Sequence, residues 1–221
     1  MIRKSERTAL LLSGGIDSAI LLHRLLQKKC TVYPVYIQSH YLWEHAELYW
    51  LKKLLHRLKS SAYLKSLTVL KTRMDDVLKH SWAINGKAVP GRSSRDEAVY
   101  LPGRNLLLIA KVSVFAAQNR ISQIALAPLA SNPFPDATHR FFRHYAKTLS
   151  LAFNTDFTIK TPFRTNRKYR LLQSVPYFPF ELTFSCLHPK SYRHCGRCNK
   201  CMERKRAFRR SGLEDKTIYA G

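Results

Sequence analysis

The sequence contains no long apolar run, no internal repeat and no low-complexity linker. None of its segments approaches the roughly 20 consecutive apolar residues that a membrane helix needs. The first apolar segment is short and runs into two glycines without a small-residue cleavage site, so we expect no secretory signal, no membrane partner and a cytoplasmic location. A chain of 221 residues that is 45% apolar is too hydrophobic for a disordered protein. These absences predict one globular domain, with at most a small appendage.

Acidic residues are scarce, with 14 Asp and Glu against 38 Lys and Arg and a formal net charge of +24. Such an excess favours polyanionic ligands: nucleotide phosphates, RNA or an acidic protein partner. The positive charge is spread along the chain, with one concentration in RCNKCMERKRAFRR, residues 197–210. Because no recognisable RNA-binding module accompanies it, nucleic acid is compatible with this charge but is not required by it.

Short apolar segments alternate with amphipathic ones along most of the chain. The spacing of apolar residues predicts strands at 8–12, 30–38, 67–72, 121–129 and 157–163, and helices at 16–28, 44–59, 105–119 and 136–153. Residues 81–104 read as irregular because Asn-Gly and Pro-Gly pairs interrupt them. Strands that alternate with helices require parallel crossovers, so we expect an α/β fold: a Rossmann-like parallel sheet with helices on both faces.

Glycine is also scarce, yet two of the eight glycines are adjacent in SGGIDS, residues 13–18, between the first strand and the first helix. Backbone N–H groups of Gly14 and Gly15, hydroxyls of Ser13 and Ser18 and the helix N-terminus would together cradle phosphate. A carboxylate at Asp17 suits a Mg²⁺ ion that bridges phosphates. The string lacks both Gly-Lys-Ser/Thr and G-x-G-x-x-G. The alternative is a plain glycine turn in which Asp17 and Ser18 cap the helix.

Four of the five cysteines lie close together near the C-terminus. They are Cys186, Cys195, Cys198 and Cys201, spaced C-x8-C-x2-C-x2-C. Four thiolates at this spacing predict a closed, structural Zn²⁺ site, with redox chemistry or an iron–sulfur cluster as the alternatives. His188 and His194 offer substitute ligands, but we expect them to be surface histidines. Cys30 stands alone and reads as a small buried hydrophobe.

The first loop resembles the pyrophosphate loop of the ATP pyrophosphatases, the PP-loop superfamily. Combined with the four-cysteine knuckle, it resembles the 7-cyano-7-deazaguanine synthase family. Three further segments strengthen the likeness: YLPGRN at 100–105, NPFPDA at 132–137 and LTFSC at 182–186. The resemblance covers most of the chain. It implies an adenine nucleotide alpha hydrolase-like fold, with residues 1–175 as the ATP-binding domain and residues 176–221 as a zinc-binding segment packed on it.

The resemblance also implies a reaction. ATP would activate the carboxylate of 7-carboxy-7-deazaguanine, ammonia would form the amide, and a second activation would dehydrate the amide to the nitrile, a queuosine-type precursor. The positioned phosphates and Mg²⁺ would stabilise the departing pyrophosphate. The resemblance further suggests a homodimer. No glutaminase domain accompanies the loop, so we expect free ammonia or ammonia from a partner.

Particular residues acquire roles through this likeness. ATP and Mg²⁺ would be held by the first loop, namely Leu12, Ser13, Gly14, Gly15, Ile16, Asp17 and Ser18. Asp17, Ser18 and Arg104 would carry the chemistry, with the Arg104 fork facing a phosphate or the substrate carboxylate. Asn105 would line the substrate site or cap the following helix. Asp136 would accept hydrogen bonds from the guanine-like edge, or cap the helix that starts near residue 137.

Some residues depart from the family pattern. Ala130 stands where the family has an acid and Pro133 where it has a glycine, and RTNRKYRLL at 164–172 lacks the usual Lys-x-Glu. We therefore expect a divergent branch. Three alternatives stay open: a deazaguanine carboxylate joined to a different nucleophile, a PP-loop enzyme that adenylates a tRNA base, and a nucleotide-binding protein whose chemistry has decayed.

Overall fold

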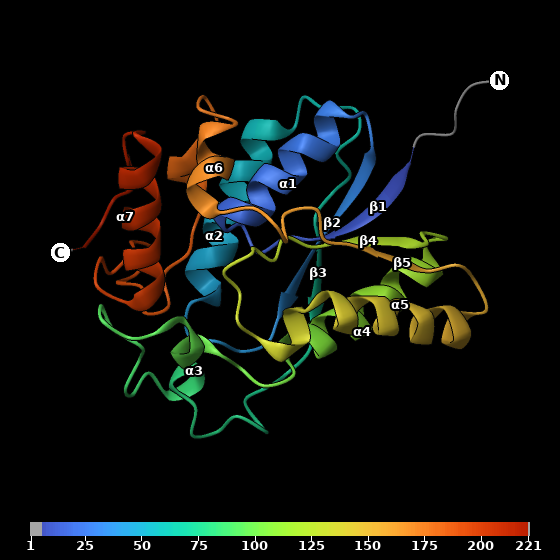
Figure 1. Ribbon diagram of the computed structural model, residues 1–221, viewed down its shortest axis with the longest axis horizontal. Helices are drawn as coiled ribbons and strands as arrows, with labels where there is room; N and C mark the ends of the chain where they lie inside the picture. Colours follow the sequence, from blue (N-terminus) through green and yellow to red (C-terminus); the bar gives the residue numbers. More distant parts are fainter. Residues whose placement is uncertain (1–5, 221) are drawn as a thin grey trace.

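The computed structural model describes residues 6–220, which contain a five-stranded, entirely parallel sheet (Figure 1). The strands are β1 (Arg7–Leu11), β2 (Thr31–Gln38), β3 (Thr68–Lys71), β4 (Gln123–Ala125) and β5 (Thr158–Lys160). Their spatial order is β3-β2-β1-β4-β5. The chain therefore reverses its direction of travel across the sheet between β1 and β4, and loops that follow these central strands can border a crevice. The parallel α/β fold expected from the sequence is confirmed.

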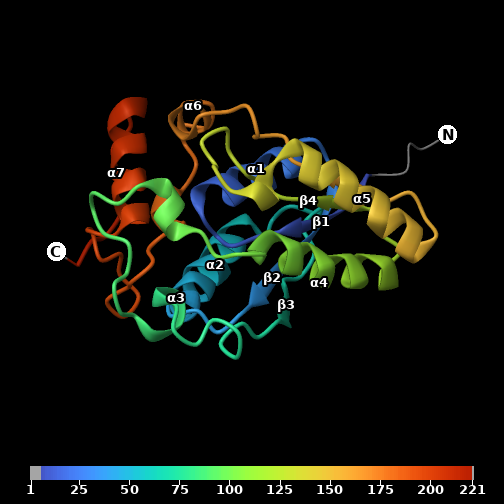
Figure 2. The same cartoon turned by 60° about the horizontal axis from the view of Figure 1, so that its bottom comes forward.

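Two apolar layers cover the sheet because neighbouring strand residues point to opposite faces. Leu10 of β1 packs with α1 (Ile16–Gln27), α2 (Glu44–Leu58) and α6 (Lys168–Gln173). Ala9 packs on the other side with α4 (Arg104–Gln118) and α5 (His139–Phe153) (Figures 1 and 2). Both residues are fully buried, as expected for the central strand of a covered sheet.

The last helix, α7 (Asn199–Ser211), lies beside α6 at the edge of the molecule, and its Ala207 and Phe208 join the core that contains α1 and α2 (Figure 1). Its Arg204 is 1% exposed and donates to Phe180 O and to the hydroxyls of Thr183 and Thr217. The C-terminal segment is thereby tied to the rest of the chain by both apolar packing and buried hydrogen bonds.

Several elements differ in length from the expected ones. The strand expected at 121–129 ends at Ala125, because the chain then leaves the ladder towards Pro128, which has no N–H to donate. The helix expected at 136–153 is split: η2 (Pro135–Ala137) precedes α5, whose N-terminus is capped by Thr138 Oγ1 accepting from Phe141 N. Residues 81–104, expected to be irregular, contain α3 (Trp82–Asn85) and η1 (Asp96–Val99), and η3 (Phe180–Leu182) precedes the cysteine cluster.

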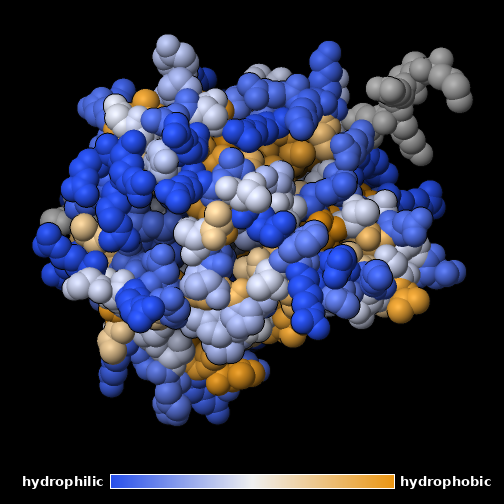
Figure 3. Space-filling view, viewed as in Figure 1, coloured by the Kyte–Doolittle hydropathy of each residue, from blue (hydrophilic) through white to orange (hydrophobic). Residues whose placement is uncertain are grey.

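The surface is largely hydrophilic on the face drawn in Figure 3, including the part formed by α7, and apolar side chains show only in separate patches. Within residues 6–220, none of the helices has the length and apolar character needed to cross a lipid bilayer.

Candidate functional site

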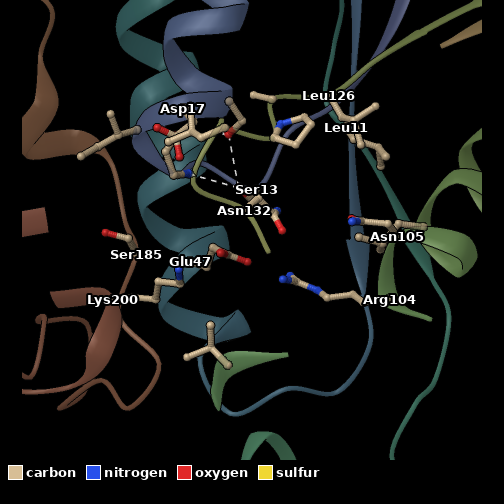
Figure 4. A pocket seen from close by; sticks show the side chains of 18 of the residues that line it. Leu11, Ser13, Asp17, Glu47, Arg104, Asn105, Leu126, Asn132, Ser185 and Lys200 are labelled. Atoms are coloured by element: carbon tan, nitrogen blue, oxygen red, sulfur yellow. Dashed lines mark hydrogen bonds between the residues drawn. The ribbon is translucent and has the colours of Figure 1, made fainter. Parts of the chain in front are cut away.

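A cavity of about 330 Å³ opens where β1, β2 and β4 end (Figure 4). Its wall contains the last residue of β1 with the two residues after it, 11–13, residues 35–37 of β2 and residues 126–129, which follow β4. The carboxyl ends of parallel strands meet at one edge of a sheet, which is where ligands of such folds bind. The opposite wall comes from the C-terminal segment, residues 184–187 and the start of α7.

The SGGIDS loop forms one end of this cavity. Ser13 Oγ accepts from Gly15 N at 3.3 Å and lies 3.2 Å from Ser18 Oγ, which donates to Gly15 O at 3.1 Å. Gly14 has a φ of +81°, and a Cβ there would lie 3.1 Å from Leu51 Cβ of α2, so glycine meets both a conformational and a steric need. Leu12 and Ile16 are 1% and 2% exposed and anchor the loop at both ends. The loop presents hydroxyls and the N-terminus of α1 to the cavity.

Asp17 points into a buried group of charges in the wall of this cavity. Its Oδ2 lies 3.2 Å from Lys168 Nζ, which is 2.6 Å from Glu203; Lys200 lies 2.7 Å from the other oxygen of Glu203. Burial raises the pKa of Asp17, and the Lys168 ammonium opposes this shift. Oδ1 of Asp17 is buried and has no hydrogen-bond partner in residues 6–220. A buried carboxylate oxygen without a donor fits a cation ligand, so this residue suits the Mg²⁺ expected from the sequence.

No motif in the sequence singles out Lys168, Lys200 or Glu203. Lys168 opens α6 within the segment that departs from the family pattern, and the other two lie on the first turns of α7, next to the cysteines. Their side chains are only 16%, 29% and 18% exposed, although they belong to strongly basic stretches that read as solvated surface. The only sequence signal was the position of α7 directly after the knuckle.

The opposite end of the cavity holds Glu47 of α2 and Arg104 of α4, whose side chains extend towards the same space (Figure 4). Arg104 Nε is buried without a hydrogen-bond partner in the described residues, and its guanidinium carbon lies 5.5 Å from the ring centre of Tyr41. Glu47 accepts a 2.8 Å hydrogen bond from the Tyr36 hydroxyl. Burial raises the pKa of Glu47 to about 7 against the opposing effects of Arg104 and Tyr36. Arg104 was expected at the site; Glu47 was not.

Asp136 lies outside the group of residues that line the cavity. Its Oδ2 accepts from the backbone N of Asn105 at 2.9 Å, and its Oδ1 and main-chain oxygen lie 3.4 and 3.1 Å from Asn105 Nδ2. Asp136 therefore caps α4 from 31 residues away, not the helix after residue 137. The expectation that its carboxylate faces the base has no support in this geometry, because that carboxylate is already engaged. Asn105 borders the cavity, so Asp136 acts there only through it.

The four cysteines predicted to bind metal lie together. The sulfur atoms of Cys186, Cys195, Cys198 and Cys201 all lie within 4.8 Å of one another, and all four residues are buried. Two of the separations are 3.9 and 4.0 Å, close to the roughly 3.8 Å expected for four thiolates at 2.3 Å around one tetrahedral ion. Backbone N–H groups of residues 187, 188, 195 and 198 point at the sulfurs from 3.2–3.4 Å. The donor set fits a single closed metal site.

His194 was expected at the surface and is not there. It is 3% exposed, its Nε2 accepts from Ser185 N, and its ring centre lies 4.4 Å from that of Phe184, with the two rings tilted by 44°. It supports the segment that carries Cys186 and does not belong to the sulfur cluster. Phe184 N in turn donates to Gly14 O at 2.9 Å, so the cysteine segment contacts the first loop directly. Cys30 is 2% exposed, as predicted.

Comparison with known proteins agrees with this arrangement. Curated relatives named 7-cyano-7-deazaguanine synthase include one from Desulfitobacterium hafniense, 27% identical over 92% of this chain and 91% of its own. Another, from Leptospira interrogans, is 27% identical over 96% of this chain and 90% of its own. Among solved structures, the U34-tRNA thiolase NcsA from Methanococcus maripaludis with its 4Fe–4S cluster superposes with a TM-score of 0.50 at 12% identity, over 93% of this chain and 65% of that chain. At that identity the likeness extends to the fold alone.

The sequence model of one protein family spans nearly all of the described chain. The family is described as "Queuosine biosynthesis protein QueC", and the match covers residues 7–212. That range includes the first loop, both ends of the cavity and all four clustered cysteines. The chain therefore belongs to the QueC family of queuosine biosynthesis proteins.

Proposed function

We propose that this protein is a 7-cyano-7-deazaguanine synthase, an ATP-dependent enzyme that forms carbon–nitrogen bonds. The observation that carries the proposal is a single cavity with an anion-binding loop at one end and, at the other, an arginine whose Nε is buried without a hydrogen-bond partner in residues 6–220. A carboxylate becomes electrophilic only when one of its oxygens is converted into a leaving group. The cavity brings the two requirements of that step together: a site for ATP phosphates and a cation for a substrate carboxylate.

In the proposed first step, the carboxylate of 7-carboxy-7-deazaguanine attacks the α-phosphate of ATP and pyrophosphate leaves. Gly15 N–H and the Ser18 hydroxyl, which donate to Ser13 Oγ and Gly15 O within the loop, would turn to phosphate oxygens when ATP binds, together with the Ser13 hydroxyl. Lys168 would supply positive charge nearby. Asp17 would hold a Mg²⁺ ion, and this ion would neutralise charge on the departing pyrophosphate. Arg104 orients the substrate carboxylate with its planar fork.

Ammonia then attacks the activated carbonyl carbon, and AMP leaves as the amide forms. A second ATP adenylates the amide oxygen with release of pyrophosphate, and that oxygen then leaves in AMP as the nitrogen loses two protons, which gives the nitrile. The hydrophobic walls of the cavity, including Trp43, Leu101 and Phe134, would limit hydrolysis of the activated acyl group by water.

We further infer that the cysteine cluster holds Zn²⁺ as a structural ion, because four thiolates leave no coordination position for substrate. The proposed division is an ATP-binding part, residues 1–175, and a zinc-binding part, residues 176–221. The proposed location is the cytoplasm, with a homodimer as the assembly. Leu106, which directly follows YLPGRN and is 43% exposed, is an apolar side chain that such an assembly could cover.

The test is incubation of the purified protein with ATP, Mg²⁺, ammonium and 7-carboxy-7-deazaguanine, with pyrophosphate release and product mass as readouts. We expect pyrophosphate release that requires the deazaguanine, and a product with the mass of the nitrile. If the final product were the amide, the proposed activation and amide formation would stand, but the proposed dehydration to the nitrile would be wrong. Absence of deazaguanine-dependent pyrophosphate release would overturn the proposed function.

A further inference from the structure

The proposed substrate has an edge with two adjacent hydrogen-bond donors, the ring N–H and the exocyclic amino group. A buried site for this edge needs an acceptor with two oxygens, because a donor buried without a partner costs binding free energy. Asp136, the residue expected from the sequence, has its carboxylate engaged by Asn105 outside the cavity. Another acceptor must therefore serve this edge.

Glu47 meets the requirement. It lines the cavity, is only 8% exposed, and is held in place by the hydrogen bond from Tyr36 to its Oε2. Within residues 6–220, the hydrogen bond from Tyr36 goes to Oε2, and no hydrogen bond to Oε1 is found. Glu44, one turn earlier on the same helix, is different: its two oxygens accept from Ser39 N at 2.6 Å and His40 N at 3.0 Å, and it does not line the cavity. Of this buried pair, Glu47 alone offers a free acceptor to a ligand.

Arg104 lies across the same space from Glu47 (Figure 4). On the substrate, the 6-oxo group neighbours the ring N–H, and the 7-carboxylate lies on the same side of the bicycle as the 6-oxo group. A guanidinium fork at this place can therefore donate to both oxygens while the carboxylate of Glu47 accepts from the other edge. Trp43 and Trp82 border the cavity with ring centres 5.6 Å apart and provide aromatic surface for a flat heterocycle.

We propose that Glu47 is the residue that recognises the deazaguanine edge, accepting hydrogen bonds from the ring N–H and the exocyclic amino group, while Arg104 donates to the 6-oxo group. This inference rests on the proposed function and assigns specificity within its site.

The ionisation of Glu47 supports the assignment. Burial raises its pKa to about 7, while Arg104 and the Tyr36 hydroxyl favour the charged form and the neighbouring Glu44 opposes it. A ligand that brings two N–H donors to this carboxylate would stabilise its charged form. Binding of such a ligand should therefore release protons from Glu47 near neutral pH.

The experiment compares two probes, 7-deazaguanine and 7-deazahypoxanthine, which differ only in the exocyclic amino group. Calorimetric titration at pH 8 of the wild-type protein should show about 10- to 100-fold tighter binding of 7-deazaguanine. In Glu47→Gln, which preserves size but replaces one acceptor oxygen with a donor, this preference should fall to about 3-fold or less. The matched control is Glu44→Gln on the same helix, which should keep the wild-type preference.

Each outcome decides the proposal. A wild-type protein that binds both probes equally overturns it without any variant, as does Glu47→Gln with the wild-type preference. If Glu47→Gln misfolds, Tyr36→Phe serves instead, because loss of the hydroxyl that positions Glu47 should reduce the preference severalfold while ATP binding is kept; an unchanged preference overturns the proposal. Preference for 7-deazaguanine without turnover of 7-carboxy-7-deazaguanine would overturn only the proposed function. Turnover with a preference independent of Glu47 would overturn only this inference.

Discussion

The ammonium nitrogen of Lys168 lies 3.2 Å from Asp17 Oδ2, and the same nitrogen lies 2.6 Å from Glu203 Oε1. The first of these carboxylates belongs to the SGGIDS loop and the second to α7. Burial lowers the pKa of Lys168, but the two carboxylates outweigh it and the pKa is raised, so this lysine is charged at neutral pH. One buried cation thus joins the phosphate-binding end of the cavity to the helix that also carries Cys201.

The first prediction concerns Asp17. Asp17→Asn keeps the size of the side chain but removes the charge that would bind Mg²⁺, so we expect pyrophosphate release to fall by about 100-fold or more. The fold should survive, because Lys168 keeps its contact with Glu203. Pyrophosphate release and thermal unfolding measure the two effects.

The control is Asp156→Asn, a substitution of an exposed aspartate in the turn before β5. It should leave both readouts at the wild-type level. Asp17→Asn with wild-type pyrophosphate release would remove Asp17 from the mechanism.

The second prediction concerns the metal. Elemental analysis should find one Zn²⁺ per chain, and Cys198→Ser should lose it, because each of the four thiolates closes the tetrahedral site. Since metal binding contributes folding free energy, the melting temperature should fall by roughly 10 °C or more.

Cys30→Ser is the matched variant, since Cys30 is also buried but lies outside the cluster. It should retain the zinc. A visible absorption spectrum typical of iron–sulfur, or equal metal content in wild type and Cys198→Ser, would contradict the zinc assignment.

The third prediction separates backbone strain from crowding in the first loop. Gly14 and Gly103 have similar φ values of +81° and +71°, but a Cβ at Gly14 meets Leu51 at 3.1 Å whereas a Cβ at Gly103 meets nothing within 4 Å. Gly103→Ala should cost about 1–2 kcal/mol of unfolding free energy from the left-handed conformation alone. Gly14→Ala should cost about 1 kcal/mol more because α2 must also yield.

Urea denaturation of both variants measures the difference. Gly14→Ala should also weaken ATP binding, because the shift falls on the phosphate-binding loop. Equal destabilisation by the two substitutions would mean that Leu51 moves aside without cost.

The features that the sequence predicted are those encoded by neighbouring residues. SGGIDS is contiguous, so its residue types alone predicted a phosphate-binding loop. The four cysteines lie within sixteen residues, so their spacing alone predicted a metal site. The alternation of apolar segments likewise predicted the parallel sheet, because strand and helix periods are local properties.

The rest of the site depends on contacts between distant segments. Glu47, Lys168 and Glu203 lie on three different helices, and a charged residue on an amphipathic helix looks the same in sequence whether it faces solvent or a cavity. Asp136 was assigned to the base because it follows β4, and its actual partner, Asn105, lies on the preceding helix, 31 residues earlier. Tertiary packing alone determines which of these polar side chains remain free for a ligand.

The last prediction is a pH dependence of stability that comes from Glu47. Its pKa is about 7 in the folded protein because burial disfavours the charge, whereas an exposed glutamate has a pKa near 4.3. Between these values Glu47 binds more protons in the folded state than in the unfolded state, so its contribution to the unfolding free energy decreases as pH rises through this window. We expect a decline of roughly 1–3 kcal/mol between pH 4.5 and 7 from this residue. Glu47→Gln should remove that decline, and Glu97→Gln, whose native side chain is 57% exposed, should retain it. Chemical denaturation of the three proteins at pH 5, 6, 7 and 8 measures the slopes. Parallel slopes in wild type and Glu47→Gln would mean that Glu47 ionises as an ordinary surface carboxylate.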